Sequence, residues 1–226
     1  MSDKIAAIAT GHARTGIGVL RLSGDGCIEA AEQVFRLNSG RPLSSLSDRK
    51  LALGTLFDAQ GRPIDHCMAF ISRAPHSYTG EDTAEIQCHG SPAALTAGLE
   101  ALFAAGFRQA RPGEFTRRAF LNGQMDLTQA EAVIDIISSK NDYALQSSVN
   151  QLKGSVHNKI KEIREVILYH TAFIESALDD PEHISVDGYG DSLLGVVKDL
   201  QQKIQCLLDT ADDGRIIKEG IKTVIV

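Results

Sequence analysis

Residues 111–127 read RPGEFTRRAFLNGQMDL, and this stretch decides how the chain divides. The dipeptide PG forms a turn, and Glu114 can occupy the first turn of a short helix with the sequence EFTRRAFL. The dipeptide NG ends that helix, and Asp126 or Thr128 can cap the next one. Two helix starts and one break in so short a stretch predict a joint between two structural bodies.

The chain before this joint combines strand candidates with few helices. A helix is predicted over 92–105, because Ser91 can cap it, Pro92 suits its first position and Gly106 ends it. A shorter helix is expected over 28–35. Strands are expected at KIAAIAT (4–10), GIGVLRLSG (16–24), LALGTLFDA (51–59), DHCMAFISR (65–73) and TAEIQCHG (83–90). This order favours an α+β fold with a mixed, largely antiparallel sheet.

The chain after residue 120 carries no strand signal until its last residues. One helix is expected over 127–139, and another over 192–208. Between them, apolar residues at steps of three or four predict a single long amphipathic helix over 143–178. Helices of unequal length cannot cover one another completely. We therefore expect an all-α partial bundle with an apolar stripe, completed by further helices of the same chain or of a partner.

Composition excludes several classes of protein. Hydrophobic residues make up 43% and charged residues 23% of the 226 residues, as is ordinary for a globular protein. No apolar run is long enough to span a membrane, and we expect a cytoplasmic protein. The four cysteines, Cys27, Cys67, Cys88 and Cys206, stand singly with no CxxC motif. This favours buried, reduced thiols, and we expect no metal site.

The charge of the chain argues against a broad nucleic-acid surface. The net charge is −6, whereas phosphate binding depends on clustered Lys and Arg. Any RNA contact must be local, although a solvated helix face is the commoner explanation of such basic residues. The basic candidates are Arg108, Arg111, Arg117, Arg118, Lys153, Lys159, Lys161 and Arg164.

Four separated segments resemble one known family, the tRNA-modification GTPases called MnmE or TrmE. They are TGIGVLRLSG, YTGEDTAEIQCHG, RPGEFTRRAFLNG and DLTQAEAVIDII, and they occur in the family's order. The resemblance implies a folate-binding and dimerisation domain over 1–120 and the first part of a helical domain over 121–215. It also implies that 216–226 begin a GTPase domain that is truncated here. Without the resemblance, the apolar residues 221–226 read equally as an edge strand or a frayed end.

The resemblance also implies a function for the full-length protein. By this resemblance, the full-length protein would hydrolyse GTP with magnesium and potassium. Together with a flavoprotein partner, MnmG or GidA, it would add an aminomethyl-type group to carbon 5 of the wobble uridine of tRNA. The 226-residue portion is expected to bind a reduced folate, 5-formyl- or 5,10-methylene-tetrahydrofolate, to form a homodimer and to lack GTPase activity alone. The alternative is a non-enzymatic folate-binding assembly module whose helices recruit partners.

Three residues match the family's folate-binding positions: Arg21, Glu85 and Gln124. Judged by spacing alone, Arg21 and Glu85 are charged residues within apolar strands. The ordinary explanation is that their side chains point to solvent from the outer face of the sheet. The resemblance makes Glu85 an acceptor for the two-donor edge of a pterin and Arg21 a donor to a ligand oxygen. Gln124 departs from the family's basic residue, so it either contacts the ligand more weakly or lies on the surface.

Two further polar features lie near Glu85. Residues 79–82, TGED, have turn chemistry and suit either an ordinary polar loop or the rim of a ligand site. His89 could act as a base or contact a ligand, and a hydrogen-bonded histidine at a strand end is favoured. No catalytic residue is assigned in this chain, because it contains no nucleophile elbow and no HExxH motif.

Overall fold

A computed structural model describes residues 2–11, 13–219 and 224, with side chains in the last helix described as far as residue 209. The chain divides into two compact units, which we call the sheet unit (residues 1–125) and the helical unit (residues 126–226). The division falls within the stretch 111–127. The boundary between the two units lies next to Asp126, which caps the first helix of the helical unit.

The sheet unit is built on a seven-stranded sheet with the order β3-β4-β5-β6-β2-β1-β7. All neighbouring strands are antiparallel except β1 and β7, which are parallel. The strands are β1 Ile5–Ile8, β2 Thr15–Ser23, β3 Phe35–Leu37, β4 Ala52–Phe57, β5 Pro63–Ser72, β6 Thr83–Gly90 and β7 Arg108–Gln109. The expected α+β class and largely antiparallel sheet are confirmed.

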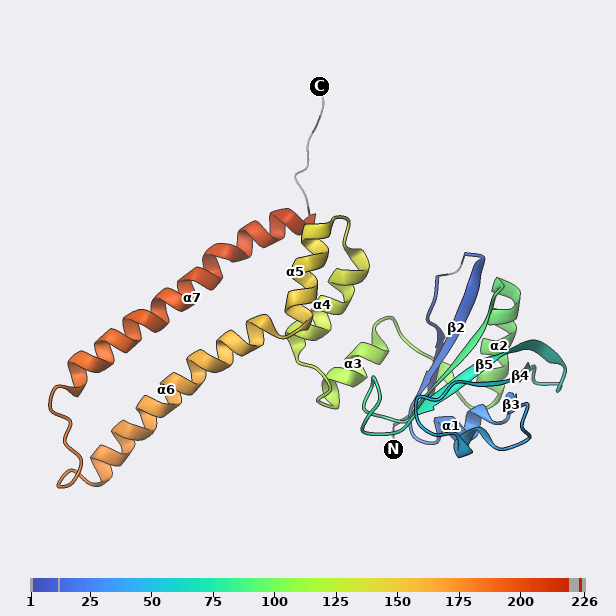
Figure 1. Cartoon of the computed structure of the whole chain (residues 1–226), viewed down its shortest axis with the longest axis horizontal. Coiled ribbons are helices and arrows are strands. Elements are labelled where there is room, and N and C mark those ends of the chain that lie inside the picture. The colour runs from blue at the N-terminus through green and yellow to red at the C-terminus, as the bar shows by residue number, and fades with distance from the viewer. Residues whose placement is uncertain (1, 12, 220–223, 225–226) are drawn as a thin grey trace. The chain divides into compact units, whose positions relative to one another are not determined.

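The core of the sheet unit lies on one face of this sheet, beneath helix α2 (Pro92–Ala104). Leu20 of β2 and Leu56 of β4 are fully buried on that face. A Cβ atom at Gly98 of α2 would lie 2.8 Å from Leu20 Cδ1 and 2.9 Å from Leu56 Cδ2, so the helix backbone approaches the sheet closely. The helix expected over 92–105 is confirmed, and Figure 1 shows it alongside the strands.

The prediction of a helix over 28–35 is wrong for the second half of that range. Helix α1 spans Cys27–Ala31, and Phe35 begins strand β3. Phe35 pairs with Leu56 of β4 and is only 1% exposed. Pairing with β4 and burial in the core therefore override the helical pattern. A short 3₁₀ helix, η1 (Leu43–Ser45), follows β3.

The short helix and the break expected within residues 111–127 are both present. Helix α3 spans Glu114–Leu121, and Gly113 precedes it with a φ of 71°. Gly123, which follows the helix, also has a φ of 71°. Only glycine adopts this left-handed conformation at little cost, which explains the turn before the helix and the break after it.

The helical unit begins with α4 (Leu127–Ser138), which has a complete capping box. The Asp126 side chain accepts a hydrogen bond from the backbone N–H of Gln129. The Gln129 side chain accepts one from the backbone N–H of Asp126. Helices α5 (Asp142–Leu152), α6 (Ser155–Asp179) and α7 (Tyr189–Glu219) follow.

The single helix expected over 143–178 is wrong, because the chain breaks between α5 and α6. Gly154 has a φ of 81°, and its N–H donates to the Gln151 carbonyl over 2.8 Å. The apolar step from Leu152 to Val156 continues across the break, so the pattern alone does not reveal it. Helix α7 is also longer than the expected 192–208. The strand expected over 221–226 lies outside the described residues, apart from Val224.

Helices α6 and α7 leave apolar surface uncovered, as expected. Ile160 and Ile167 of α6 are each 49% exposed, and Ile204 of α7 is 42% exposed. Figure 1 shows the two helices side by side. A groove of about 440 Å³ lies between them, with Ile163 and Leu200 among its lining residues. Within the described part of the chain, no helix has the length and apolar character needed to cross a membrane.

Candidate functional site

The centre of the candidate site is a charged pair across two neighbouring strands. Arg21 of β2 lies directly opposite Glu85 of β6, and Arg21 Nε donates a hydrogen bond to Glu85 Oε1 over 2.6 Å. Their side chains are 35% and 19% exposed. Leu20 and Ile86, which neighbour them along the strands, face the core and are fully buried. Side chains alternate along a strand, so the pair projects from the face of the sheet opposite to α2.

Two aromatic rings lie beside this pair. The Arg21 guanidinium carbon is 5.5 Å from the centre of the Tyr78 ring and 5.9 Å from that of Phe115. These distances suit a cation–π interaction, which stabilises the arginine in one place. The hydroxyl groups of Tyr78 and Thr116 are hydrogen-bonded at 3.0 Å, linking the loop before β6 to α3. A charged pair thus lies next to two aromatic rings, a combination of groups that can hold a flat polar ligand.

Gln124 lies in the same unit but does not join the pair. It is exposed, and a Cβ atom at Gly80 would lie 3.1 Å from Gln124 Nε2. Its side chain therefore packs on the loop that carries Tyr78. The described residues include no hydrogen bond between Gln124 and either Arg21 or Glu85. The structure thus brings two of the three predicted residues into contact and places the third against a loop beside them.

A network of ion pairs holds α3 on the sheet unit, and the sequence reasoning missed it. Arg108 donates to both carboxylate oxygens of Glu114, over 2.9 and 2.5 Å. Arg118 contacts Glu81 at 2.8 Å and Glu114 at 3.2 Å, and both arginines also pair with Asp3. The hydrogen bond from Arg108 outweighs the opposing effect of burial and lowers the pKa of Glu114 to about 2. The Glu114–Arg118 spacing of four residues was the one available sequence signal.

This network changes the interpretation of the basic residues near the joint. Arg108 and Arg118 were candidates for a local RNA contact, but both are engaged in ion pairs within the chain. Arg118 is only 8% exposed. Arg117 of α3 is exposed. Of these three arginines, Arg117 therefore remains the most accessible to a partner.

The loop at residues 79–82 belongs mainly to the structural framework. Thr79 is fully buried, and its hydroxyl lies 2.7 Å from the Ser23 hydroxyl. The Ser23 hydroxyl also donates to Glu81 Oε2 over 2.8 Å. These side chains face the protein, so the Thr79 and Glu81 side chains do not form the rim of a ligand site. Gly80, which packs against Gln124, is the part of this loop nearest the candidate site, and Tyr78, just before the loop, lies near Arg21.

The prediction of buried thiols is confirmed for Cys27, Cys67 and Cys88, whereas Cys206 on α7 is exposed. Burial raises the pKa of the Cys27 thiol, which donates to the Asp82 carbonyl over 3.0 Å. A hydrogen bond with Cys67, together with burial, raises the pKa of Cys88. The Cys27 and Cys88 thiols are therefore protonated near neutral pH.

The open face of the sheet also carries apolar side chains. Ile17 of β2 is 61% exposed, Leu53 of β4 48% and Met68 of β5 41%. These side chains and the backbone near them line a shallow hollow of about 210 Å³. Exposed apolar residues gathered on one sheet face are typical of a surface that another molecule covers.

The fold and the site define a class of protein. It has an α+β domain with a charged pair on an open sheet face, followed by a helical domain. Residues 4–124 match the family described as GTP-binding protein TrmE N-terminus, and residues 127–223 match the family described as MnmE helical domain. The chain belongs to the MnmE (TrmE) family.

Curated relatives named tRNA modification GTPase MnmE agree with this assignment. The protein from Lachnoclostridium phytofermentans is 47% identical over 230 residues, covering 100% of this chain and 49% of the relative. The protein from Alkaliphilus metalliredigens is 40% identical over 227 residues, again covering 100% and 49%. The protein from Symbiobacterium thermophilum is 43% identical over 224 residues, covering 99% and 49%. The chain therefore spans about half the length of the curated relatives it matches.

Proposed function

We propose that this chain forms the folate-binding and first helical part of a longer GTP-hydrolysing protein that modifies the wobble uridine of tRNA. The relatives' shared name supports the GTPase activity and the tRNA substrate. GTP, magnesium and potassium would bind in the full-length protein outside the sheet unit. A flavoprotein partner, MnmG or GidA, would take part in adding the aminomethyl-type group.

The observation that carries the folate proposal is the Arg21–Glu85 pair on an open sheet face. A carboxylate has about four lone-pair sites, and Arg21 occupies one of them on Glu85 Oε1. Glu85 can therefore still accept two hydrogen bonds from neighbouring donors. A pterin ring offers such an edge, an amide N–H beside an exocyclic amine. The ionised carboxylate would make both bonds charge-assisted and therefore strong.

The other residues of the site would orient the same ligand. The Tyr78 and Phe115 rings provide planar surfaces near Arg21. Arg21 keeps N–H groups beyond the one that contacts Glu85, and these could bond a ligand carbonyl. Gln124 would contact the ligand from the loop at Gly80. A bound reduced folate, 5-formyl- or 5,10-methylene-tetrahydrofolate, supplies a one-carbon unit, whereas the residues of this chain bind and orient it.

A homodimer through the sheet unit is part of the proposal. Ile17, Leu53 and Met68 are exposed on the sheet face that also carries the charged pair. Covering them with a second copy would remove apolar surface from water. Sedimentation at several concentrations tests this. A dimer weakened by Met68→Asp would support the interface, and a chain that stays monomeric at all concentrations would refute it.

Isothermal titration of 5-formyltetrahydrofolate tests the folate site. The chain should bind without nucleotide, and Glu85→Ala should weaken binding by about tenfold to a hundredfold. That loss corresponds to about 1.5–3 kcal/mol for hydrogen bonds to a charged group. Glu29→Ala provides a matched control, because Glu29 is an exposed carboxylate on α1. Equal affinities for the wild type, Glu85→Ala and Glu29→Ala would exclude Glu85 from the site.

A further inference from the structure

Two buried cysteines that are far apart in the sequence lie beside each other in the sheet. Met68 of β5 pairs with Gln87 of β6, and Cys67 and Cys88 are the next residues along these antiparallel strands. Both side chains face the core, with exposures of 5% and 2%. Strand register, which spacing alone does not reveal, brings the two thiols together.

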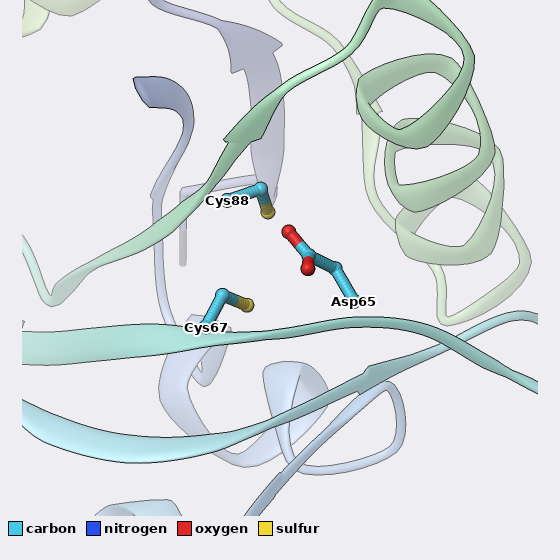
Figure 2. Close-up of side chains that lie close together, drawn as sticks. All are labelled: Asp65, Cys67 and Cys88. Atoms are coloured by element: carbon cyan, nitrogen blue, oxygen red, sulfur yellow. The ribbon is translucent and has the colours of Figure 1, made fainter. Parts of the chain in front are cut away.

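The Asp65 carboxylate lies close to these two thiols. Asp65 precedes Cys67 by two residues and therefore projects from the same face of β5. The two sulfur atoms and a carboxylate oxygen of Asp65 all lie within 4.8 Å of one another. Figure 2 shows the Cys88 thiol and the Asp65 carboxylate pointing toward each other, with the Cys67 thiol nearby. One ion could contact all three side chains after small rotamer changes, because zinc lies about 2.3 Å from sulfur and about 2.0–2.2 Å from oxygen.

His89 lies beside the Asp65 carboxylate. Its Nδ1 lies 2.9 Å from Asp65 Oδ1, and its backbone N–H donates to Asp65 Oδ2 over 2.7 Å. The Asp65 side chain is 11% exposed, whereas the His89 ring is 78% exposed. The carboxylate is therefore held near the thiols, and the imidazole stands on the solvent side. An ion could enter from that side.

We propose that Cys67, Cys88 and Asp65 form a zinc-binding site where the start of β5 meets the end of β6, with His89 holding the Asp65 carboxylate in place from the solvent side. Zinc would displace the two thiol protons to solvent, so that two thiolates and one carboxylate oxygen hold the ion and a water fills the fourth tetrahedral position. Thiolate ligands disfavour magnesium and calcium, which prefer oxygen. The site is independent of the folate proposal, because Cys67 and Cys88 face the core side of the sheet, whereas Arg21 and Glu85 project from the opposite face.

Cobalt provides a direct test, because thiolate ligands give Co²⁺ a strong charge-transfer absorption. The reduced 226-residue chain is titrated with Co²⁺ alone and then with Zn²⁺. One Co²⁺ should bind per chain with the thiolate band, and one Zn²⁺ should displace it. The double variant Cys67→Ser/Cys88→Ser should lose the band, while Asp65→Asn and His89→Ala should each weaken binding by about tenfold or more.

Two controls separate zinc binding from loss of fold. Cys27→Ser changes another buried thiol and Cys206→Ser an exposed one, and both should keep the cobalt band. Circular dichroism checks that each variant remains folded. The proposal is overturned if the wild-type chain shows no thiolate band at saturating Co²⁺. It is also overturned if the band survives in the folded double variant, or if a Cys67–Cys88 disulfide forms and Zn²⁺ does not bind the reduced chain.

Discussion

The sheet unit and the helical unit use similar amounts of chain but bury their apolar residues very differently. In the sheet unit, Leu20, Leu56 and Ile86 are fully buried between the sheet and α2. In the helical unit, Ile167 of α6 and Ile204 of α7 stay 49% and 42% exposed. Buried apolar area is the main source of folding free energy. The sheet unit therefore holds a complete core, whereas α6 and α7 present apolar faces that a further helix or a partner can cover.

This difference in burial also suits the two units to different functions. The charged pair of Arg21 and Glu85 stands on a rigid sheet, and α3 is fixed beside it by ion pairs. Precise hydrogen bonding to a small ligand requires such rigid support. The exposed faces of α6 and α7 instead suit contacts with another helix. The predictions below test this contrast, beginning with the largest expected effect.

A core substitution should distinguish the two units most strongly. Leu20→Ala removes a fully buried side chain and should reduce the free energy of unfolding by about 2–5 kcal/mol. Ile167→Ala removes a side chain that is 49% exposed and should cost about 1 kcal/mol or less. Urea unfolding followed by circular dichroism measures both. Equal losses for the two variants would contradict the contrast in burial.

The ion pairs that hold α3 should make stability depend on pH. The folded-state pKa of Glu114 is about 2, below its ordinary value of 4.5. Its contribution is therefore fully present above about pH 5 and is lost as the pH falls toward 2. Glu114→Gln should cost on the order of 2 kcal/mol at pH 7, and the difference from wild type should shrink with falling pH.

Unfolding free energies of the wild type and Glu114→Gln between pH 7 and pH 3 provide the measurement. Glu29→Gln is the matched control, because Glu29 is exposed on α1. A difference between wild type and Glu114→Gln that stays constant over this pH range would show that the Glu114 charge does not stabilise α3.

The cap of α4 should have a smaller effect, confined to the helical unit. Asp126 accepts hydrogen bonds from the Gln129 N–H and the Thr128 hydroxyl. Asp126→Ala should cost about 1 kcal/mol, whereas Asp126→Asn should retain most of the cap. Hydrogen exchange should show faster opening of α4 with α2 unchanged. Faster exchange in α2 as well would mean that the two units do not behave separately.

The smallest predicted effect concerns Gln124, which lies against Gly80 at the end of the sheet unit. If Gln124 faces an anionic group of a folate, Gln124→Lys should tighten binding by up to about fivefold at low salt, as for an exposed ion pair. The gain should fade as salt rises, because the Debye length is about 10 Å at 0.1 M. An affinity unchanged at both salt concentrations would place Gln124 outside the ligand shell.

Local sequence signals predicted the joint well, because its structure depends on local chemistry. Gly113, Gly123 and Asp126 act through their own backbone conformation or caps, so their roles are visible in the residues themselves. The break at Gly154 was missed because the apolar spacing continues across it. Strand β3 was missed because Phe35 is held in place by β4, a partner distant in the sequence.

The candidate site was predictable only in part, because its contacts also join segments that are distant in the sequence. Arg21 and Glu85 stand out as charged residues in apolar strands, but their contact depends on the register of β2 against β6. The closeness of the Cys67 and Cys88 thiols depends on the register of β5 against β6 in the same way. Side chains from distant segments, such as Tyr78 and Phe115, meet at Arg21 only after the fold has formed.

The central claim is that Arg21 and Glu85 act together to bind a reduced folate, and a double-mutant cycle tests it most directly. The affinity for 5-formyltetrahydrofolate is measured by calorimetry, without nucleotide, for the wild-type chain, Arg21→Ala, Glu85→Ala and the double variant. We predict that each single variant binds more weakly and that the double variant loses less than the sum, with a coupling energy of about 1 kcal/mol or more. Four equal affinities, or no binding by the wild-type chain, would contradict the account.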